Sequence, residues 1–167
     1  IAPALSPGTL NDVMVTNPDA LSVTVPNAWL ADFLDVPQGD IFHDGVEKVF
    51  RHAITAGYGN GDYGRDDSVT RAQMAVFLLK GEHGSSYVPP ACTGIFQDVA
   101  CTPGIGFSDW IEQLLNENIT GGCFTDPLRY CPDREVRRDE MAVFLLKTEH
   151  GSGYVSPPCT GVFQDVA

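Results

Sequence analysis

The chain has five cysteines, and their spacing restricts the chemistry that they can perform more than that of any other residue type. Cys92 and Cys101 flank the segment Phe-Gln-Asp-Val-Ala, whereas Cys123 and Cys131 flank a later loop. None has the C-x-x-C spacing typical of a zinc site, and no histidine lies nearby in sequence, so disulfides are favoured over a metal. We expect the pairs Cys92–Cys101 and Cys123–Cys131, although spacing leaves other pairings open. Disulfides imply an oxidising compartment, which is the periplasm or the cell exterior.

Cys159 is the fifth cysteine, and it has no partner in this pattern. It is the counterpart of Cys92 in a second copy of the same segment, where Phe-Gln-Asp-Val-Ala ends the chain at Ala167. Cys101 directly follows this pentapeptide in the first copy. We therefore expect a cysteine at the next position of the parent protein, so that Cys159 is unpaired only in this chain.

Arginines are the second group that could bind a ligand. Four of the seven lie within ten residues, at Arg129, Arg134, Arg137 and Arg138. The chain as a whole is acidic, with 22 acidic against 10 basic side chains and a net charge of −12. This balance excludes a nucleic-acid partner, which requires a basic surface, but the local cluster still allows an anionic ligand.

No group of residues indicates catalysis. The sequence lacks G-x-S-x-G, a Walker loop and H-E-x-x-H. His83 and His150 recur in the same context, where the last turn of a helix explains them without a metal. The loop at 59–67 lacks the residue order and the closing glutamate of a calcium loop. We expect no enzyme activity, no cofactor and no bound metal.

Composition places the chain among folded proteins. Of its 167 residues 43% are hydrophobic and 19% are charged, which is enough to build a core. No apolar run approaches the roughly 20 residues that cross a bilayer, so we expect no transmembrane segment. The chain begins at Ile1 without a basic start or an apolar signal core, as a mature or excised segment would.

An internal repeat organises most of the chain. Residues 74–100 return 67 residues later at 141–167 with five differences, and residues 46–58 align with 111–123. The first copy has Tyr58 and Gly64 where the second has Cys123 and Cys131. The joint absence of both cysteines is what a disulfide between them predicts.

Each copy has the pattern of a helix, a loop and a second helix. Apolar residues follow a helical stripe in both first helices, at Val46, Val49, Phe50 and Ile54 and at Trp110, Ile111, Leu114, Leu115 and Ile119. Thr70 and Gln73 form a capping box that predicts where the second helix begins. Arg137 occupies the place of Thr70 in the other copy, so that helix start is less well specified.

The first forty residues differ from the rest. Residues 12–16 and 21–25 are rich in β-branched side chains and surround the turn residues 17–19, which predicts a hairpin. Residues 27–34 fit a last strand or a short helix. Because a lone hairpin is only marginally stable, we expect these strands to pack on the helical units or on a partner chain.

The repeated motifs resemble S-layer homology repeats. In order they are Phe-x-Asp-Val, a helix carrying Trp-Ile, Ile-Thr-x-Gly, Tyr-x-Pro and Val-Thr-Arg-Ala-Gln-Met-Ala-Val-Phe-Leu. On this resemblance residues 41–94 form repeat 1, residues 95–161 form repeat 2, and residues 162–167 begin a truncated third repeat. Residues 1–40 are similar to the closing strands of an IPT/TIG immunoglobulin-like domain, followed by a linker.

The resemblance implies a mainly α fold, in which tandem helix–loop–helix repeats form a helical bundle after a short N-terminal β-hairpin. It also implies a secreted, non-catalytic module at the bacterial cell surface. Such a module anchors a larger protein to anionic cell-wall or envelope polysaccharide. The alternative is a structural subunit that assembles with copies of itself into a surface layer or filament, because the chain starts on strands and stops at the opening of a repeat.

The resemblance also assigns candidate polysaccharide-binding residues. The arginine of the Thr-Arg-Ala-Glu motif, which contacts the acidic sugar, falls on Arg71 and Arg138, with Thr70 and Arg137 beside them. A guanidinium at a helix N-terminus is a sensible anion site, because free backbone N–H groups lie next to it. Tyr63 and Tyr130 either stack on a sugar or fill the repeat core, and the arginines either bind sugar or pair with neighbouring acids.

Overall fold

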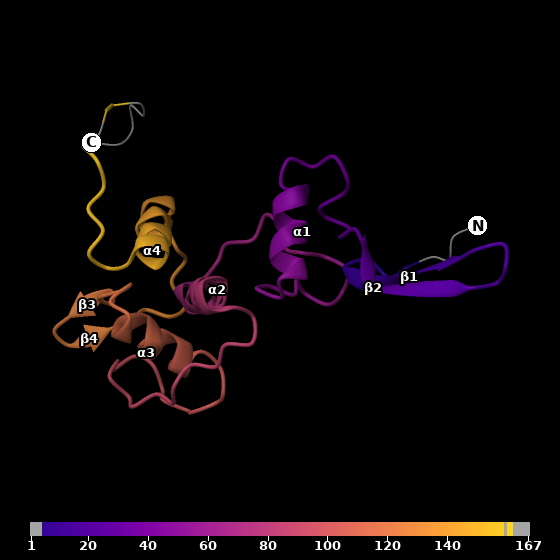
Figure 1. Cartoon of the computed structure of the whole chain (residues 1–167). Helices are drawn as coiled ribbons and strands as arrows, with labels where there is room; N and C mark the ends of the chain where they lie inside the picture. Colours follow the sequence, from indigo (N-terminus) through magenta and orange to yellow (C-terminus); the bar gives the residue numbers. More distant parts are fainter. Residues whose placement is uncertain (1–4, 159, 162–167) are drawn as a thin grey trace. The chain divides into compact units, whose positions relative to one another are not determined.

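The computed structural model describes residues 5–158 and 160–161, and Figure 1 shows its elements along the chain. In chain order they are β1 (Thr9–Thr16), β2 (Ser22–Ala31), α1 (His43–Arg51), α2 (Arg71–His83), α3 (Ser108–Asn116), β3 (Phe124–Thr125), β4 (Leu128–Arg129) and α4 (Arg138–His150). Residues up to Ser68 form one compact unit together with 83–86, and the remaining residues form a second. None of these helices has the length and apolar character needed to cross a membrane. Cys159 and the third-repeat segment lie outside the described residues.

The prediction of a mainly α-helical bundle is wrong. Of the described residues 28% are helical and 17% are extended, so the chain mixes α and β structure. The physical reason is helix length, since each helix has only nine or thirteen residues. The loops between them are rich in glycine and proline, which disfavour helix, and the hairpin adds two long strands.

β1 and β2 pair in an antiparallel hairpin, as the β-branched segments predict. The Asn17 side-chain oxygen accepts the backbone N–H groups of Asp19 and Leu21 in the turn, at 3.1 and 2.9 Å. This side chain closes the connection in the way that asparagine commonly does in turns. The turn chemistry and the strand residues therefore specify the same hairpin.

β2 continues past Pro26 to Ala31, so the segment that fits strand or helix by sequence begins as a strand. Leu30 is buried, but most apolar side chains of the hairpin are exposed, among them Val15 at 58% and Val23 at 61%. The described residues therefore do not cover the hairpin. The expectation that it packs on another surface stays a prediction.

A small core forms in the first unit where the chain leaves β2. Phe33 and Val36 are buried and pack with Val46 of α1. The rings of Phe33 and Tyr63 meet edge to face with centroids 5.4 Å apart. Phe33-Leu-Asp-Val is thus another copy of the Phe-Gln-Asp-Val segment at 96–99, a copy that the sequence analysis missed.

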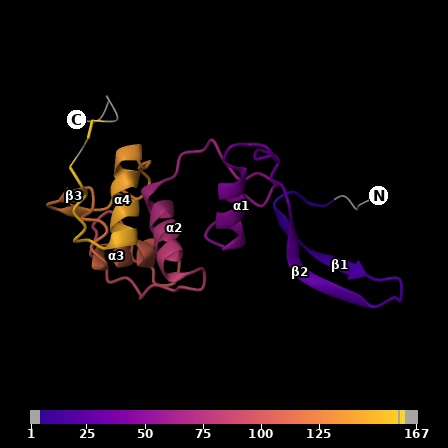
Figure 2. The same ribbon diagram turned by 45° about the horizontal axis from the view of Figure 1, so that its top comes forward.

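The second unit has a larger core that α2, α3 and α4 surround, and Figure 2 shows α2 and α4 next to each other. Its buried members are Ala72, Met74, Ala75, Leu78, Leu79, Phe96, Ile111, Leu114, Ile119, Tyr130 and Phe144. α2 is apolar on nearly every side, which suits a helix packed between other elements. Phe144 is the one fully buried member from α4, with Met141 partly buried beside the core, although the two helices share the sequence Met-Ala-Val-Phe-Leu-Leu-Lys.

Aspartates of the Phe-x-Asp-Val segments hold the loops that carry the aromatic residues. Asp35 accepts the backbone N–H groups of residues 63–65 at 2.7 to 3.1 Å. Asp98 accepts those of residues 130 and 131, both at 2.8 Å. Each carboxylate accepts hydrogen bonds from the backbone N–H groups of consecutive loop residues. These groups lie outside helices and sheets and need another acceptor.

Two carboxylates of α3 and two disulfides hold the loops of the second unit. Glu112 accepts the N–H groups of residues 93–95 at 2.6 to 2.8 Å. Asp109 accepts the N–H groups of residues 92 and 104 at 2.8 and 2.6 Å. The structure joins Cys92 to Cys101 and Cys123 to Cys131, which are the two pairs that we expected. The loops are therefore held by charge-assisted hydrogen bonds and cross-links.

Folding stability should fall at acid pH. Burial raises the pKa of Glu112, but the N–H groups of residues 93–95 outweigh it and hold that pKa below its ordinary value. The same balance lowers the pKa of Asp35. Both carboxylates therefore stabilise the fold above their unfolded pKa, about 4, and lose this effect as the pH falls through their folded pKa.

Urea unfolding followed by circular dichroism tests this expectation. The parent chain should lose stability steadily below about pH 4. Glu112→Gln should lower the unfolding midpoint at neutral pH and flatten its dependence on pH. Glu149→Gln, at an exposed position of α4, should match the parent. A Glu112→Gln midpoint equal to that of the parent at neutral pH would contradict the role given to this carboxylate.

Candidate binding site at Arg71

α2 begins with the capping box that the sequence predicts. The Thr70 hydroxyl accepts the N–H of Gln73 at 3.2 Å, and the Gln73 side-chain oxygen accepts the N–H of Thr70 at 2.9 Å. Each bond satisfies a backbone donor that a helix start leaves unpaired. Arg71 is consequently held as the first residue of the helix, where its backbone N–H donates to the Arg134 carbonyl at 2.8 Å.

Arg71 is almost entirely buried, with only 2% of the residue exposed. Its Nε donates to the Tyr130 carbonyl at 2.8 Å, and its Nη2 donates to the Thr120 hydroxyl at 3.5 Å. The guanidinium carbon lies 4.8 Å from the ring centroid of Tyr130 and 5.3 Å from that of Phe144. Aromatic rings and two oxygen acceptors therefore hold a planar cation in one position.

Glu140 is the acidic neighbour of this arginine. Its Oε1 lies 3.9 Å from Nη1 of Arg71, but it also accepts Nη2 of Arg134 at 2.5 Å. Burial raises the pKa of Glu140, yet the hydrogen bond from Arg134 and the backbone N–H of Arg137 outweigh it, so the pKa is lowered. Glu140 is therefore ionised at neutral pH and its charge is shared between two arginines. Burial lowers the pKa of Arg71, but arginine stays charged at neutral pH.

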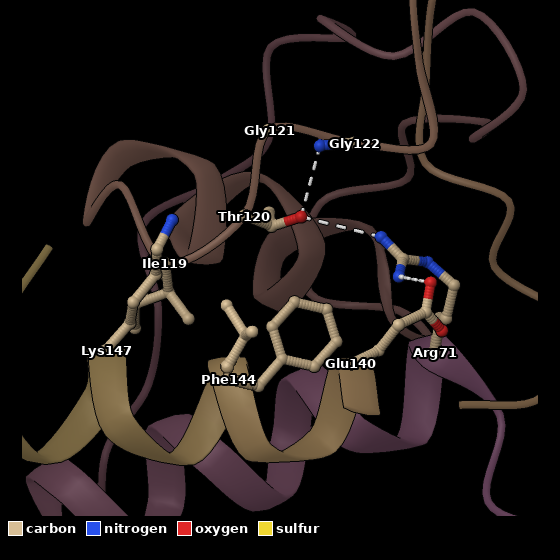
Figure 3. Close-up of a pocket in the computed structure, with 9 residues that line it drawn as sticks. Arg71, Ile119, Thr120, Gly121, Gly122, Glu140, Phe144 and Lys147 are labelled. Carbon is tan, nitrogen blue, oxygen red and sulfur yellow. Dashed lines mark hydrogen bonds and ion pairs between the residues drawn. The ribbon is translucent and has the colours of Figure 1, made fainter. Parts of the chain in front are cut away.

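These side chains border a pocket of about 220 Å³, which Figure 3 shows. The lining residues are Arg71, Ile119, Thr120, Gly121, Gly122, Glu140, Val143, Phe144 and Lys147. Arg71 and Lys147 lie at opposite ends in the view of Figure 3, while the loop after α3 faces α4 across the pocket. Two cations and one carboxylate give the lining a net positive charge, which favours an anionic ligand.

The loop after α3 forms one wall of the pocket because of its glycines. The Gly122 N–H donates to the Thr120 hydroxyl at 3.1 Å. Gly122 has a φ of 83°, and a Cβ there would lie 2.4 Å from the Arg129 carbonyl oxygen, so only glycine fits. Gly121 also lines the pocket, and a Cβ there would meet no atom within 4 Å.

The structure brings three of the predicted site residues together in the second unit. Arg71 lines the pocket, Thr70 caps its helix, and Tyr130 lies beside it. Tyr130 is 0% exposed and its hydroxyl donates to the Arg71 carbonyl at 2.7 Å. Burial raises the pKa of this tyrosine far above its ordinary value. The Tyr130 ring thus supports the arginine from within the core and does not face the pocket.

The other predicted residues are placed elsewhere. Arg137 and Arg138 are exposed at the start of α4 and are not among the lining residues. Arg137 donates to the Asp139 carboxylate at 2.6 Å, in a surface ion pair that contributes little to stability. Tyr63 is half-buried in the first unit against Phe33.

Several lining residues were not assigned from the sequence, above all Thr120, Glu140 and Lys147. A signal for Thr120 was present, because Ile-Thr follows the first helix of both copies, at 54–55 and 119–120. In the sequence Glu140 is one of the acids with which the neighbouring arginines can pair. Nothing in the sequence alone indicates that α4 faces the loop after α3.

Two comparisons with known proteins bear on the family. Residues 32–75 match the model of the S-layer homology domain, which confirms the resemblance for that segment. A surface layer protein of Brevibacillus choshinensis is 30% identical over 138 residues, an alignment that covers 77% of this chain and 12% of that protein. The chain thus corresponds to a small part of this relative. The second repeat and the IPT/TIG-like segment stay predictions.

Tyr130→Phe should destabilise the second unit by about 1 kcal/mol, because the buried Arg71 carbonyl loses its hydroxyl donor. Urea unfolding at neutral pH measures this change. Tyr154→Phe removes a hydroxyl from a partly exposed tyrosine and serves as the matched control, with an expected change near zero. Equal midpoints for Tyr130→Phe and the parent would show that the hydroxyl does not hold the start of α2.

Proposed function

We propose that this chain is part of a non-catalytic module that anchors a larger bacterial protein to anionic polysaccharide of the cell wall or envelope. The S-layer homology match and the likeness to a surface layer protein support a cell-surface module. Because the chain corresponds to 12% of that relative, the protein being anchored and its location at the surface are part of the proposal.

The observation that carries the proposal is the fixed guanidinium of Arg71 at a positively charged pocket. Arginine binds carboxylate and phosphate groups through two parallel N–H donors, which suits the acidic substituent of a sugar. Lys147 adds a second cation, and Glu140 is already engaged by Arg134. An anionic group that enters therefore meets more positive than negative charge.

The size and lining of the pocket suit one unit of a polymer. Its 220 Å³ is below the roughly 300 to 1,000 Å³ of pockets that enclose drug-sized ligands. Phe144 and Val143 offer an apolar wall against which a sugar ring can lie, while Gly121 lets the ligand approach the backbone. A small, open site of this kind binds weakly by itself, so we infer that a polymer gains strength from several sites.

Arg138 is the proposed second binding arginine, and Arg137 and Tyr63 are further residues proposed to bind polysaccharide. Arg138 has the same position in the second copy as Arg71 has in the first. Unlike Arg71, it is exposed in the part of the chain that the structure describes. A site there needs further elements to enclose the guanidinium, as Tyr130 and Phe144 enclose Arg71. Assembly of the chain with copies of itself is the second candidate function, and the exposed apolar face of α4 favours it.

Sedimentation with purified cell walls of Brevibacillus choshinensis tests the anchoring proposal. The parent chain should sediment with intact walls but not with walls stripped of their polysaccharide by acid, and added salt should weaken binding. Lys147→Glu reverses a partly exposed charge in the pocket lining and should weaken binding at least about tenfold. Arg71→Gln should abolish it.

Lys48→Glu is the matched control, because it makes the same charge change on an exposed position of α1 that does not line the pocket. It should bind as the parent does. Circular dichroism of each variant checks the fold, which matters most for the buried Arg71. Failure of the parent to bind intact walls, or equal binding by Lys147→Glu and the parent, would overturn the proposal.

A further inference from the structure

The loop that Cys123 and Cys131 close has a counterpart in the first unit, at residues 58–64, that contains no cysteine. In that counterpart the Tyr58 N–H donates to the Asp62 carbonyl at 3.0 Å. In the second unit the Cys123 N–H donates to the Arg129 carbonyl at 2.7 Å. The two loops therefore close through an equivalent backbone hydrogen bond, although a disulfide joins the ends of the second loop alone.

A carboxylate also holds each loop in the same way. Asp35 accepts the N–H groups of residues 63–65, and Asp98 accepts those of residues 130 and 131. The loop of the first unit forms with these hydrogen bonds and without a cross-link. The same hydrogen bonds therefore specify the fold of the loop in the second unit, and the disulfide adds a further constraint to it.

Cys131 has a backbone conformation that suits glycine. Its φ is 59°, in the left-handed region, and its counterpart Gly64 has a φ of 85°. A side chain raises the free energy of this conformation, which glycine adopts freely. The disulfide to Cys123 keeps Cys131 in the left-handed region, so breaking this bond frees the residue to leave it.

The disulfide lies next to both sides of the Arg71 site. Cys123 directly follows Gly122, which lines the pocket. Cys131 directly follows Tyr130, whose carbonyl accepts the Nε–H of Arg71 at 2.8 Å. One covalent bond therefore ties a wall of the pocket to the acceptor that orients the guanidinium.

A reductant can reach this bond. Cys123 and Cys131 are partly exposed, and residues 124–127 between them are exposed. One thiolate of a dithiol attacks a cysteine sulfur and breaks the S–S bond, and the second thiol of the reductant then displaces that cysteine. The disulfide gains two electrons and two protons to become two thiols, while the dithiol is oxidised to a cyclic disulfide.

We propose that the Cys123–Cys131 disulfide is a redox switch for the Arg71 pocket. When a dithiol reduces it, Cys131 leaves the left-handed region, the Tyr130 carbonyl no longer holds Arg71 in place, and the pocket loses affinity for its anion. The core and the carboxylate of Asp98 keep the unit folded. This regulation rests on the proposed function, and it makes the pocket bind in an oxidising compartment and release in a reducing one.

Nuclear magnetic resonance of the ¹⁵N-labelled chain, with and without dithiothreitol, tests the switch. Exchange of the Arg71 Nε–H with water reports how firmly the side chain is held, without any ligand. Dithiothreitol should speed this exchange at least about tenfold, because a cross-link between residues eight apart restricts open loop conformations by more than that factor. Binding of polysaccharide fragments from Brevibacillus choshinensis cell walls should weaken by a similar factor, while circular dichroism stays unchanged.

Three double variants identify the bond responsible. Cys92→Ser with Cys101→Ser removes the other disulfide, whose residues do not line the pocket, and should respond to dithiothreitol as the parent does. Cys123→Ser with Cys131→Ser should exchange as fast as the reduced parent in either condition. Cys123→Ser with Cys131→Gly should exchange more slowly than this serine pair, because glycine accepts the left-handed conformation.

The switch is ruled out if the Arg71 Nε–H exchanges equally in the parent before and after the cross-link is broken. Loss of the circular dichroism signal on reduction would also overturn it, because the disulfide would then hold the whole unit and not the pocket. An oxidised parent that binds no polysaccharide contradicts the proposed function instead. The exchange of the Arg71 Nε–H still decides, in that case, whether the cross-link controls the arginine.

Discussion

The carboxylate of Asp98 is the interaction on which the second unit depends. By accepting the N–H groups of residues 130 and 131, it fixes a loop that has no regular structure of its own. That loop presents the Tyr130 ring to the core and the Tyr130 carbonyl to Arg71. The cross-link between Cys123 and Cys131 closes the same loop, so a hydrogen-bonded carboxylate and a covalent bond define one geometry.

The pocket follows from the way in which that loop constrains Arg71. Burying a guanidinium is costly unless its donors are satisfied and its charge is compensated. Here aromatic rings cover it, two oxygens accept its N–H groups, and Glu140 lies near its outer edge. The same enclosure that stabilises the cation places it at the edge of a small, positively charged pocket, so its structural role and its proposed binding role belong to one side chain.

Local features of the chain were predictable from sequence, whereas tertiary ones were not. The capping box of Thr70, the hairpin and both cysteine pairs depend on residues close in sequence, and the structure contains all of them. The mainly α fold that the resemblance implies is wrong, because glycine- and proline-rich loops keep the helices short and the hairpin adds long strands. The Phe33 copy was missed because it precedes Phe96 by 63 residues, not by the 67 of the main repeat. Thr120 is 49 residues from Arg71, so only the folded chain brings them together.

Nuclear magnetic resonance of the ¹⁵N-labelled chain tests most directly whether the Arg71 pocket binds an anionic glycan. The Nε–H of Arg71 is buried and hydrogen-bonded, so its signal should be protected from exchange with water and resolved from those of exposed arginines. On titration with acidic cell-wall polysaccharide fragments, this signal and the amide signals of Gly121 and Gly122 should shift together with one affinity. Shifts confined to the hairpin or α1, with the Arg71 signal unchanged at saturation, would contradict the proposed site.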